Sequence, residues 1–97
     1  MVLTTTNSIE GHKIEDYLGI VTGVSTIVKT SFSFSADKNK KILKETIEKV
    51  KEEAFQSLKL NATKLKANAV VGIKLDMEIE AGSYFFISIT GTAVKIV

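Results

Sequence analysis

Apolar residues recur every three or four positions through the middle of the chain, which is the spacing of one face of an α-helix. The residues on that face are Leu43, Ile47, Val50, Ala54, Leu58, Ala62 and Leu65. Ser35 or Asp37 can cap the first turn, and Asn68 can end the helix because asparagine tolerates a left-handed backbone conformation. The pattern predicts one helix from about Asp37 to about Lys66, roughly 45 Å long.

A strict alternation of apolar and charged residues follows the predicted helix. Every odd position of Val71–Ile79 is apolar and the even positions from 74 onwards are charged, which is the period of a strand with one buried face. Residues 81–83 supply turn chemistry, and residues 84–97 form a second β-rich run. Beyond Gly91 the apolar positions of this run change from odd to even, which predicts a bulge or bend at that glycine.

The first third of the chain is also rich in β-forming residues. Tyr17–Val28 predicts a strand in which Gly19 and Gly23 allow a close approach of another segment. Val2–Thr6 predicts a weaker strand, and Glu10–Lys13 the turn between the two.

The order of these elements predicts an α+β fold made of a single domain over residues 1–97. We expect a two-layer, split β-α-β-β subunit in which one long helix lies on a small, mainly antiparallel sheet, with a short N-terminal strand added. The connection through the helix is long enough for the strands on either side of it to run parallel, with the last strand paired between them.

The composition narrows the class of protein. Hydrophobic residues make up 44% of the 97 positions and charged residues 25%, which is typical of a globular chain rather than a disordered one. No apolar run approaches the ~20 residues of a membrane helix and no secretion leader opens the chain, so we expect a soluble, cytoplasmic protein without a membrane partner. The absence of cysteine excludes disulfides, thiolate metal sites and thiol nucleophiles.

Charge is distributed unevenly along the chain. Residues 38–66 contain nine lysines and four glutamates, whereas the rest of the chain contains four lysines and seven acidic residues. A lysine-rich helix face attracts polyanions, although a solvated face with interspersed glutamates is the more common case. The chain has no arginine, the residue best suited to bidentate contacts with guanine and phosphate, so we expect no sequence-specific nucleic-acid binding.

Three blocks of residues resemble the YbjQ-like family, and they occur in the family's order. The blocks are Glu10-Gly11 with Ile14 and residues 17–23, the helix-to-strand junction Leu65–Ile73, and the last strand at Ile87–Val94. The resemblance implies a dodecin-like subunit assembled into a ring, usually a pentamer, in a family commonly labelled heavy-metal-binding without an established reaction. The chain departs from the family at Val24, where many members have a glutamate, and in residues 29–40, where many have a Gly-Arg-Ser segment.

The metal label directs attention to His12, the one histidine, with Glu15 and Asp16 beside it. Soft and borderline metals prefer thiolate or imidazole ligands, so these three residues would need help from symmetry-related copies around a ring. The simpler interpretation places His12 in a solvated turn and the two acids at the end of a strand. The alternating acids of residues 76–80 are open to hard cations, but are more commonly the polar face of a strand.

No arrangement of residues indicates catalysis. Ser8 and Glu10 lie near His12 in sequence, but without the surroundings of a nucleophile in a catalytic triad. Gly19 and Gly23 are not followed by the lysine and hydroxyl residue of a phosphate-binding loop. We therefore expect a protein that is not an enzyme and has no cofactor.

Apolar residues that one helix cannot cover predict self-association. Phe86, Val94 and Ile96 have the opposite parity to the other apolar residues of the last strand, so they emerge on the second face of the sheet. Phe32 and Phe34 alternate with serines in a half-polar segment that suits a subunit boundary. We expect all five at the interfaces of a closed homo-oligomeric ring, and the resemblance implies a pentamer.

Three hypotheses for function result. The first is a non-catalytic, ring-forming protein of the YbjQ-like type, with or without a small ligand between its subunits. The second is a metal-ion-binding protein with carboxylate and histidine sites between subunits. The third is a weak, lysine-driven polyanion binder.

Overall fold

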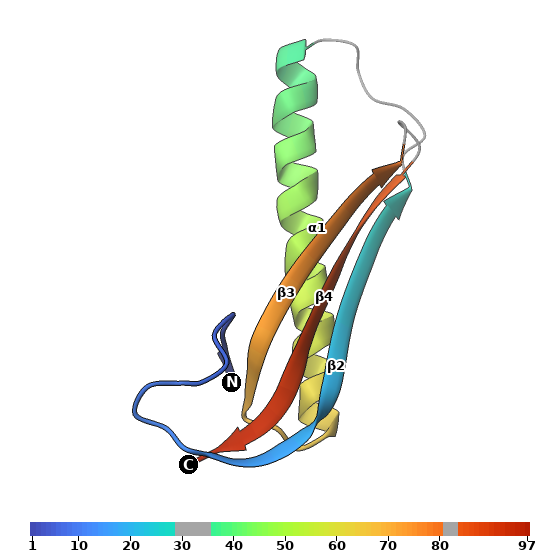
Figure 1. The fold of residues 1–97 in the computed structure, drawn as a ribbon. Coiled ribbons are helices and arrows are strands. Elements are labelled where there is room, and N and C mark those ends of the chain that lie inside the picture. Colours follow the sequence, from blue (N-terminus) through green and yellow to red (C-terminus); the bar gives the residue numbers. More distant parts are fainter. Residues whose placement is uncertain (29–35, 81–83) are drawn as a thin grey trace.

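The structure, a computed structural model, describes residues 1–28, 36–80 and 84–97, with the backbone alone at 27–28, 36–43, 79–80 and 84–85. Its elements are strand β1 (Val2–Leu3), strand β2 (Ile14–Val28), helix α1 (Ala36–Lys64), strand β3 (Ala69–Glu80) and strand β4 (Tyr84–Ile96). The strands form one sheet in the order β1-β3-β4-β2, and α1 lies along one face of it (Figure 1). The predicted α+β architecture is confirmed.

The topology of the sheet also agrees with the prediction. Strand β4 pairs antiparallel with both β2 and β3, so those two strands run parallel to each other with β4 between them. Strand β1 adds to the outer edge of β3 in the parallel sense. Strands β1 and β2 therefore lie at opposite edges of the sheet, and the segment between them has to cross it.

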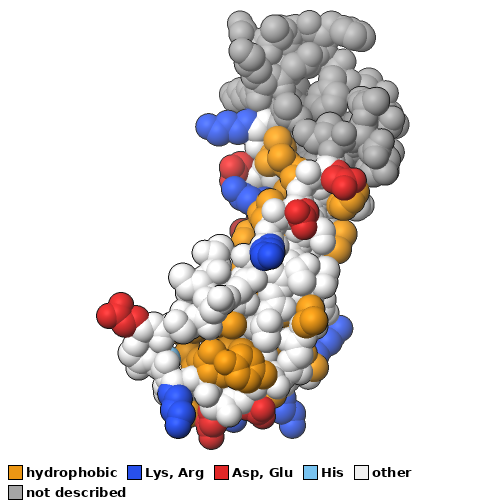
Figure 2. Space-filling model, in the orientation of Figure 1, with side chains coloured by type: hydrophobic (Ala, Val, Ile, Leu, Met, Phe, Trp, Pro, Cys, Tyr) orange, Lys and Arg blue, Asp and Glu red, His pale blue; other side chains and the backbone are white. Residues whose placement is uncertain are grey.

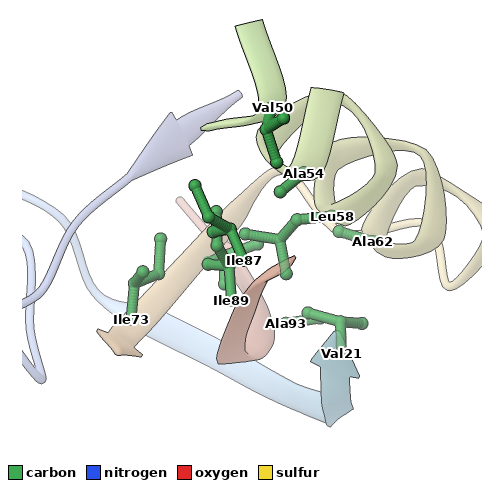
Figure 3. Close-up of a cluster of buried hydrophobic side chains, with 10 residues drawn as sticks. Val21, Val50, Ala54, Leu58, Ala62, Ile73, Ile87, Ile89 and Ala93 are labelled. Carbon is green, nitrogen blue, oxygen red and sulfur yellow. The ribbon is translucent and has the colours of Figure 1, made fainter. Parts of the chain in front are cut away.

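The buried stripe of α1 is the one that its periodicity predicts. Among the side chains of α1 that the structure describes, residues 44–64, the fully buried ones are Val50, Ala54, Leu58 and Ala62. The predicted stripe residue Leu43 lies outside the described side chains. They form the main core with sheet residues that include Val21, Ile87 and Ile89 (Figure 3). Leu65 lies beyond the helix and is 40% exposed, so the stripe ends one position earlier than expected. Among the described residues, no helix combines the length and hydrophobicity that crossing a bilayer requires.

Helix and sheet meet without an intervening side chain at Gly23. A Cβ atom at this position would lie 2.1 Å from the carbonyl oxygen of Ala54 and 2.6 Å from the amide nitrogen of Leu58. Beside this contact, the Ser25 hydroxyl donates a hydrogen bond to Glu53 (2.9 Å), and a side-chain amide of α1 donates one to the backbone of β2. The close approach expected at Gly23 is thus confirmed, and it holds α1 over β2.

The bulge predicted at Gly91 of β4 lies instead in the neighbouring strand β3, opposite Gly91. The register shifts between Val71 and Lys74, where Gly72 and Ile73 together face Gly91. Gly72 has a φ of +63°, a left-handed conformation that glycine adopts without strain. The extra residue reverses the alternation of side chains. Val71 therefore points away from the helix, whereas Ile73 points toward it, and the predicted alternation is wrong for Val71.

A second apolar cluster lies on the sheet face away from the helix, where β3 begins and β4 ends. The segment that connects β1 to β2 crosses here, and its Ile9 packs against the cluster together with Ile14. The buried members are Ala69, Val71, Val94 and Ile96. The prediction that a neighbouring subunit covers Val94 and Ile96 is therefore corrected: they are 0% and 8% exposed because their own chain covers them.

The helix ends at Lys64, close to the predicted end near Lys66, and Lys66 rather than Asn68 takes the left-handed position beyond it. The amides of Lys66 and Ala67 donate to carbonyls of the last helical turn, and Lys66 has a φ of +65°. This is the Schellman arrangement, in which the left-handed position is usually a glycine. Asn68 instead exchanges two hydrogen bonds with the backbone of Ile96, at 2.9 and 2.7 Å, and so extends the pairing of the sheet.

The contact at Gly23 leads to a first prediction. We expect Gly23→Ala to lower the free energy of unfolding by about 2–3 kcal/mol, because the added methyl group overlaps the helix backbone and must push α1 away. Thr26→Ala, on the exposed side of the same strand, should change it by less than about 1 kcal/mol. Urea unfolding followed by circular dichroism, at one protein concentration, measures both. Equal effects of the two variants would contradict the close contact.

The helix end leads to a second prediction. Lys66→Gly should stabilise the protein by up to about 1 kcal/mol, because it relieves the left-handed strain of a residue with a side chain. Lys49→Gly makes the same substitution at an exposed position inside the helix, where it should destabilise by about 0.5–1 kcal/mol. Thermal melts of the two variants should therefore shift in opposite directions. A loss of stability in Lys66→Gly would be evidence against the Schellman ending.

Candidate functional site

The sheet face away from the helix, which we call the far face, exposes large apolar side chains on β2. Tyr17, Ile20 and Val24 are 68%, 78% and 49% exposed. Ile20 pairs with Thr92 of β4 and Val24 with Ser88, so short hydroxyl side chains stand beside them and do not cover them. Figure 2, in which the sheet lies in front of the helix, shows hydrophobic side chains exposed among charged ones.

On the helix side of the sheet, β3 is left uncovered. Leu75 and Met77 pair with Ile89 and Ile87 of β4 and point to the same side of the sheet. The two β4 residues are buried beneath α1, whereas Leu75 and Met77 are 43% and 45% exposed. The helix thus covers β2 and β4 but not this part of β3. We call the uncovered surface of Leu75 and Met77 the open strip.

Basic side chains flank the open strip. Glu53 and Asn61 bind β2, so the opposite flank of α1, which carries Lys51, Phe55 and Lys59, faces β3. All three of these residues are half-buried, and Phe55 packs against the edge of the main core. The ammonium group of Lys51 lies 3.5 Å from a carboxylate oxygen of Glu48.

Acidic side chains lie on the far face of β3. Asp76 and Glu78 pair with Ser88 and Phe86 of β4, and both acids are exposed. In the part of the chain that the structure describes, neither has an ion-pair partner. Phe86 is half-buried on this face. The two remaining residues expected at a subunit interface, Phe32 and Phe34, lie outside the described residues.

His12 contacts the end of the chain rather than acidic side chains. Its Nδ1 atom lies 3.2 Å from the backbone oxygen of Val97, and the Val97 amide donates to the carbonyl of Lys13. Glu15 and Asp16 follow in β2 at a register shift, and Asp16 pairs with Lys95 of β4. The residue opposite Asp16 is thus Lys95, whose positive charge disfavours a metal ion at this position.

The structure does not bring the proposed metal ligands together. Residues 1–28, 36–80 and 84–97 contain no group of three histidine, cysteine, aspartate or glutamate side chains that could hold a metal ion. His12, Glu15 and Asp16 therefore form no metal site within one subunit, and a site completed by neighbouring subunits stays a prediction. The physical reason is that His12 turns toward Val97, while the two acids are adjacent in an exposed strand.

Comparison with known proteins places the chain in a family. A family model described as "Putative heavy-metal-binding" matches residues 1–97. A UPF0145 protein of Clostridium kluyveri is 36% identical over 106 aligned residues, which cover 99% of either chain. The chain belongs to the YbjQ family. The resemblance seen in the three sequence blocks is confirmed.

A solved structure agrees with the fold of this YbjQ chain. It is the crystal structure of a protein of unknown function of the DUF74 family from Pediococcus pentosaceus. The two folds superpose with a TM-score of 0.74, over 100% of this chain and 98% of that one, at 24% sequence identity. Neither relative indicates a catalytic role, and the function of the YbjQ family is not established.

The side chains of this YbjQ chain are poorly suited to bind soft or borderline heavy metals. Zinc, copper and nickel are held mainly by thiolate and imidazole ligands, and the chain offers no cysteine and a single histidine. The ring of that histidine already contacts Val97. Among the described residues, one subunit therefore offers no cluster of three ligating side chains for such a metal.

The exposed residues Leu75 and Met77 were not recognisable as surface residues from the sequence. They occupy the apolar positions of a strictly alternating strand, which is the pattern of a buried face. The alternation correctly places both residues on the side of the sheet that bears the helix. It does not show that the helix fails to cover this part of the sheet. No pattern in the sequence around Ile20 indicates that this residue is exposed either.

The donor set leads to a third prediction. Purified protein incubated with excess zinc, copper or nickel and then dialysed should retain far less than one metal ion per subunit by elemental analysis. His12→Asn, whose amide can still contact the Val97 carbonyl, should give the same result. Retention of one ion per subunit, or of a fixed ratio such as one per ring that disappears in His12→Asn, would contradict the prediction.

Proposed function

We propose that this YbjQ protein is a non-catalytic, self-assembling protein whose copies join into a closed ring. The observation that carries the proposal is the exposure of large apolar side chains on both sides of one sheet: Ile20 and Val24 on the far face, Leu75 and Met77 on the helix side. Fully burying a large apolar side chain gains about 1.5–3 kcal/mol, and these four residues, which are 43–78% exposed, lack a corresponding part of that gain. Covering these surfaces would gain much of that free energy.

The distribution of the exposed residues supports a head-to-tail contact. The two apolar surfaces lie on opposite sides of the sheet and at different strands, and they differ in composition. When different surfaces of identical subunits meet, the contact repeats from copy to copy and forms either a ring or an open filament. We propose the ring, and the resemblance to the YbjQ-like family supports five subunits.

Nothing in the described site argues for an enzyme. Its exposed apolar residues stand beside hydroxyl side chains and isolated charges, without the nucleophile, base and orienting group that catalysis would need. We include in the proposal that the protein is not an enzyme and acts in the cytoplasm, without membrane or sequence-specific nucleic-acid partners. Cell fractionation tests the location directly.

The self-assembly leads to a fourth prediction. Light scattering behind a sizing column should give the mass of a closed oligomer at micromolar concentration. Ile20→Asp should raise the concentration for half-dissociation at least about tenfold, because it places a charge in an apolar contact.

The control for this experiment is Leu60→Asp, which changes an exposed apolar residue of α1 away from both surfaces. It should leave the mass unchanged. A monomer mass for the unaltered protein would overturn the proposed function, whereas a tetramer or hexamer would change only the number of subunits.

A further inference from the structure

The two uncovered surfaces carry opposite charges beside their apolar residues. Lys51 and Lys59 flank the open strip on the helix side of the sheet. Asp76 and Glu78 stand on the far face, on the same side as Ile20 and Val24 of β2, and Lys74 stands beside them on β3. On the helix flank, Lys51 forms an ion pair with Glu48, the one ion pair that involves any of these charged groups among the described residues. Acids therefore outnumber the lysine on this part of the far face, whereas Lys51 and Lys59 outnumber Glu48 beside the open strip.

We propose that the far face of one copy packs on the open strip of the next, with the acids of β3 directed to the lysines of α1. The proposal rests on the proposed self-assembly and names the surfaces that perform it. The occupant of the open strip is a second copy of this chain, because its far face supplies both apolar side chains and the complementary charges.

The same charges disfavour the symmetric alternatives. Two open strips facing each other would bring the lysines of both copies together. Two far faces would bring together Asp76 and Glu78 of both copies, with only Lys74 of each copy to offset them. Like charges at an interface lower affinity, whereas the head-to-tail contact pairs opposite ones. Every copy therefore uses each surface once, which is the arrangement that a ring requires.

Reversing the charges of each surface tests this pairing. One variant is Lys51→Glu with Lys59→Glu, and the other is Asp76→Lys with Glu78→Lys. Each should raise the concentration for half-dissociation about tenfold or more, measured by light scattering on dilution at low salt, because attraction at the contact becomes repulsion. The variant that combines all four substitutions restores opposite charges across the contact and should recover the assembly of the unaltered protein.

A control separates local pairing from net charge. The four-residue variant keeps the formal net charge of +2. Glu45→Lys on the outer face of α1 and Glu10→Lys in the turn before β2, both at exposed positions, restore the same net charge when added to the lysine reversals. Neither residue belongs to the open strip or to the acids of β3. This control should remain dissociated, and the two control substitutions alone should leave assembly unchanged.

The outcomes distinguish this inference from the proposed function. If the unaltered protein assembles but either reversal leaves its dissociation unchanged, the named surfaces are wrong while self-assembly stands. If both reversals dissociate the oligomer and the four-residue variant does not recover, the two surfaces are not opposite each other and the pairing is overturned. If assembly recovers in the four-residue variant but not in the net-charge control, the pairing of the two surfaces is established. Circular dichroism of every variant confirms that the subunit is folded.

Discussion

The direct contact of α1 with the backbone of β2 at Gly23 decides the form of this subunit. A helix normally rests on the side chains of a sheet, but here no side chain stands between them, and Ala54 and Leu58 lie against the strand itself. The hydrogen bonds from Ser25 to Glu53 and from Asn61 to the carbonyl of Thr22 flank this contact. They fix the helix over one side of the sheet rather than over its middle.

The asymmetric position of the helix explains which surfaces remain uncovered. A single helix of about 10 Å diameter cannot span three strands spaced about 4.8 Å apart if it is centred near one edge. Ile87 and Ile89 of β4 are buried beneath it, and their neighbours Met77 and Leu75 on β3 are not. The open strip is thus a consequence of the close packing at Gly23, and the same contact that stabilises the subunit leaves it incompletely covered.

The N-terminal segment covers part of the other face. It pairs with the edge of β3 through backbone hydrogen bonds at Val70, Gly72 and Ile73, then crosses the sheet to begin β2. In crossing, it places Ile9 over the second cluster. Coverage of the far face therefore ends where this segment ends, and the exposed Ile20 and Val24 lie beyond it on β2. At this end of the molecule the His12 ring has a structural contact, with the backbone oxygen of Val97, and does not face a group of carboxylates.

The local repeats of the sequence determined the elements and their order. A period of 3.6 residues defined the buried stripe of α1, and a period of two defined β3, because each period follows from the geometry of the backbone itself. The inventory of side chains also determined that a thiolate metal site is impossible, since the chain has no cysteine. The pairing of β4 between β2 and β3 was predictable from the lengths of the connections.

Only the tertiary structure decided how completely each element is covered. The bulge at Gly72 sends Val71 to the far face, against the alternation of its neighbours, because one extra residue reverses the direction of the side chains. Val94 and Ile96 are buried by Ile9 and Ile14, which are more than 75 positions away in the chain. Lys66, and not Asn68, adopts the left-handed conformation, since Asn68 is needed to pair with Ile96. Such outcomes depend on contacts between distant segments, and no local pattern in the sequence records them.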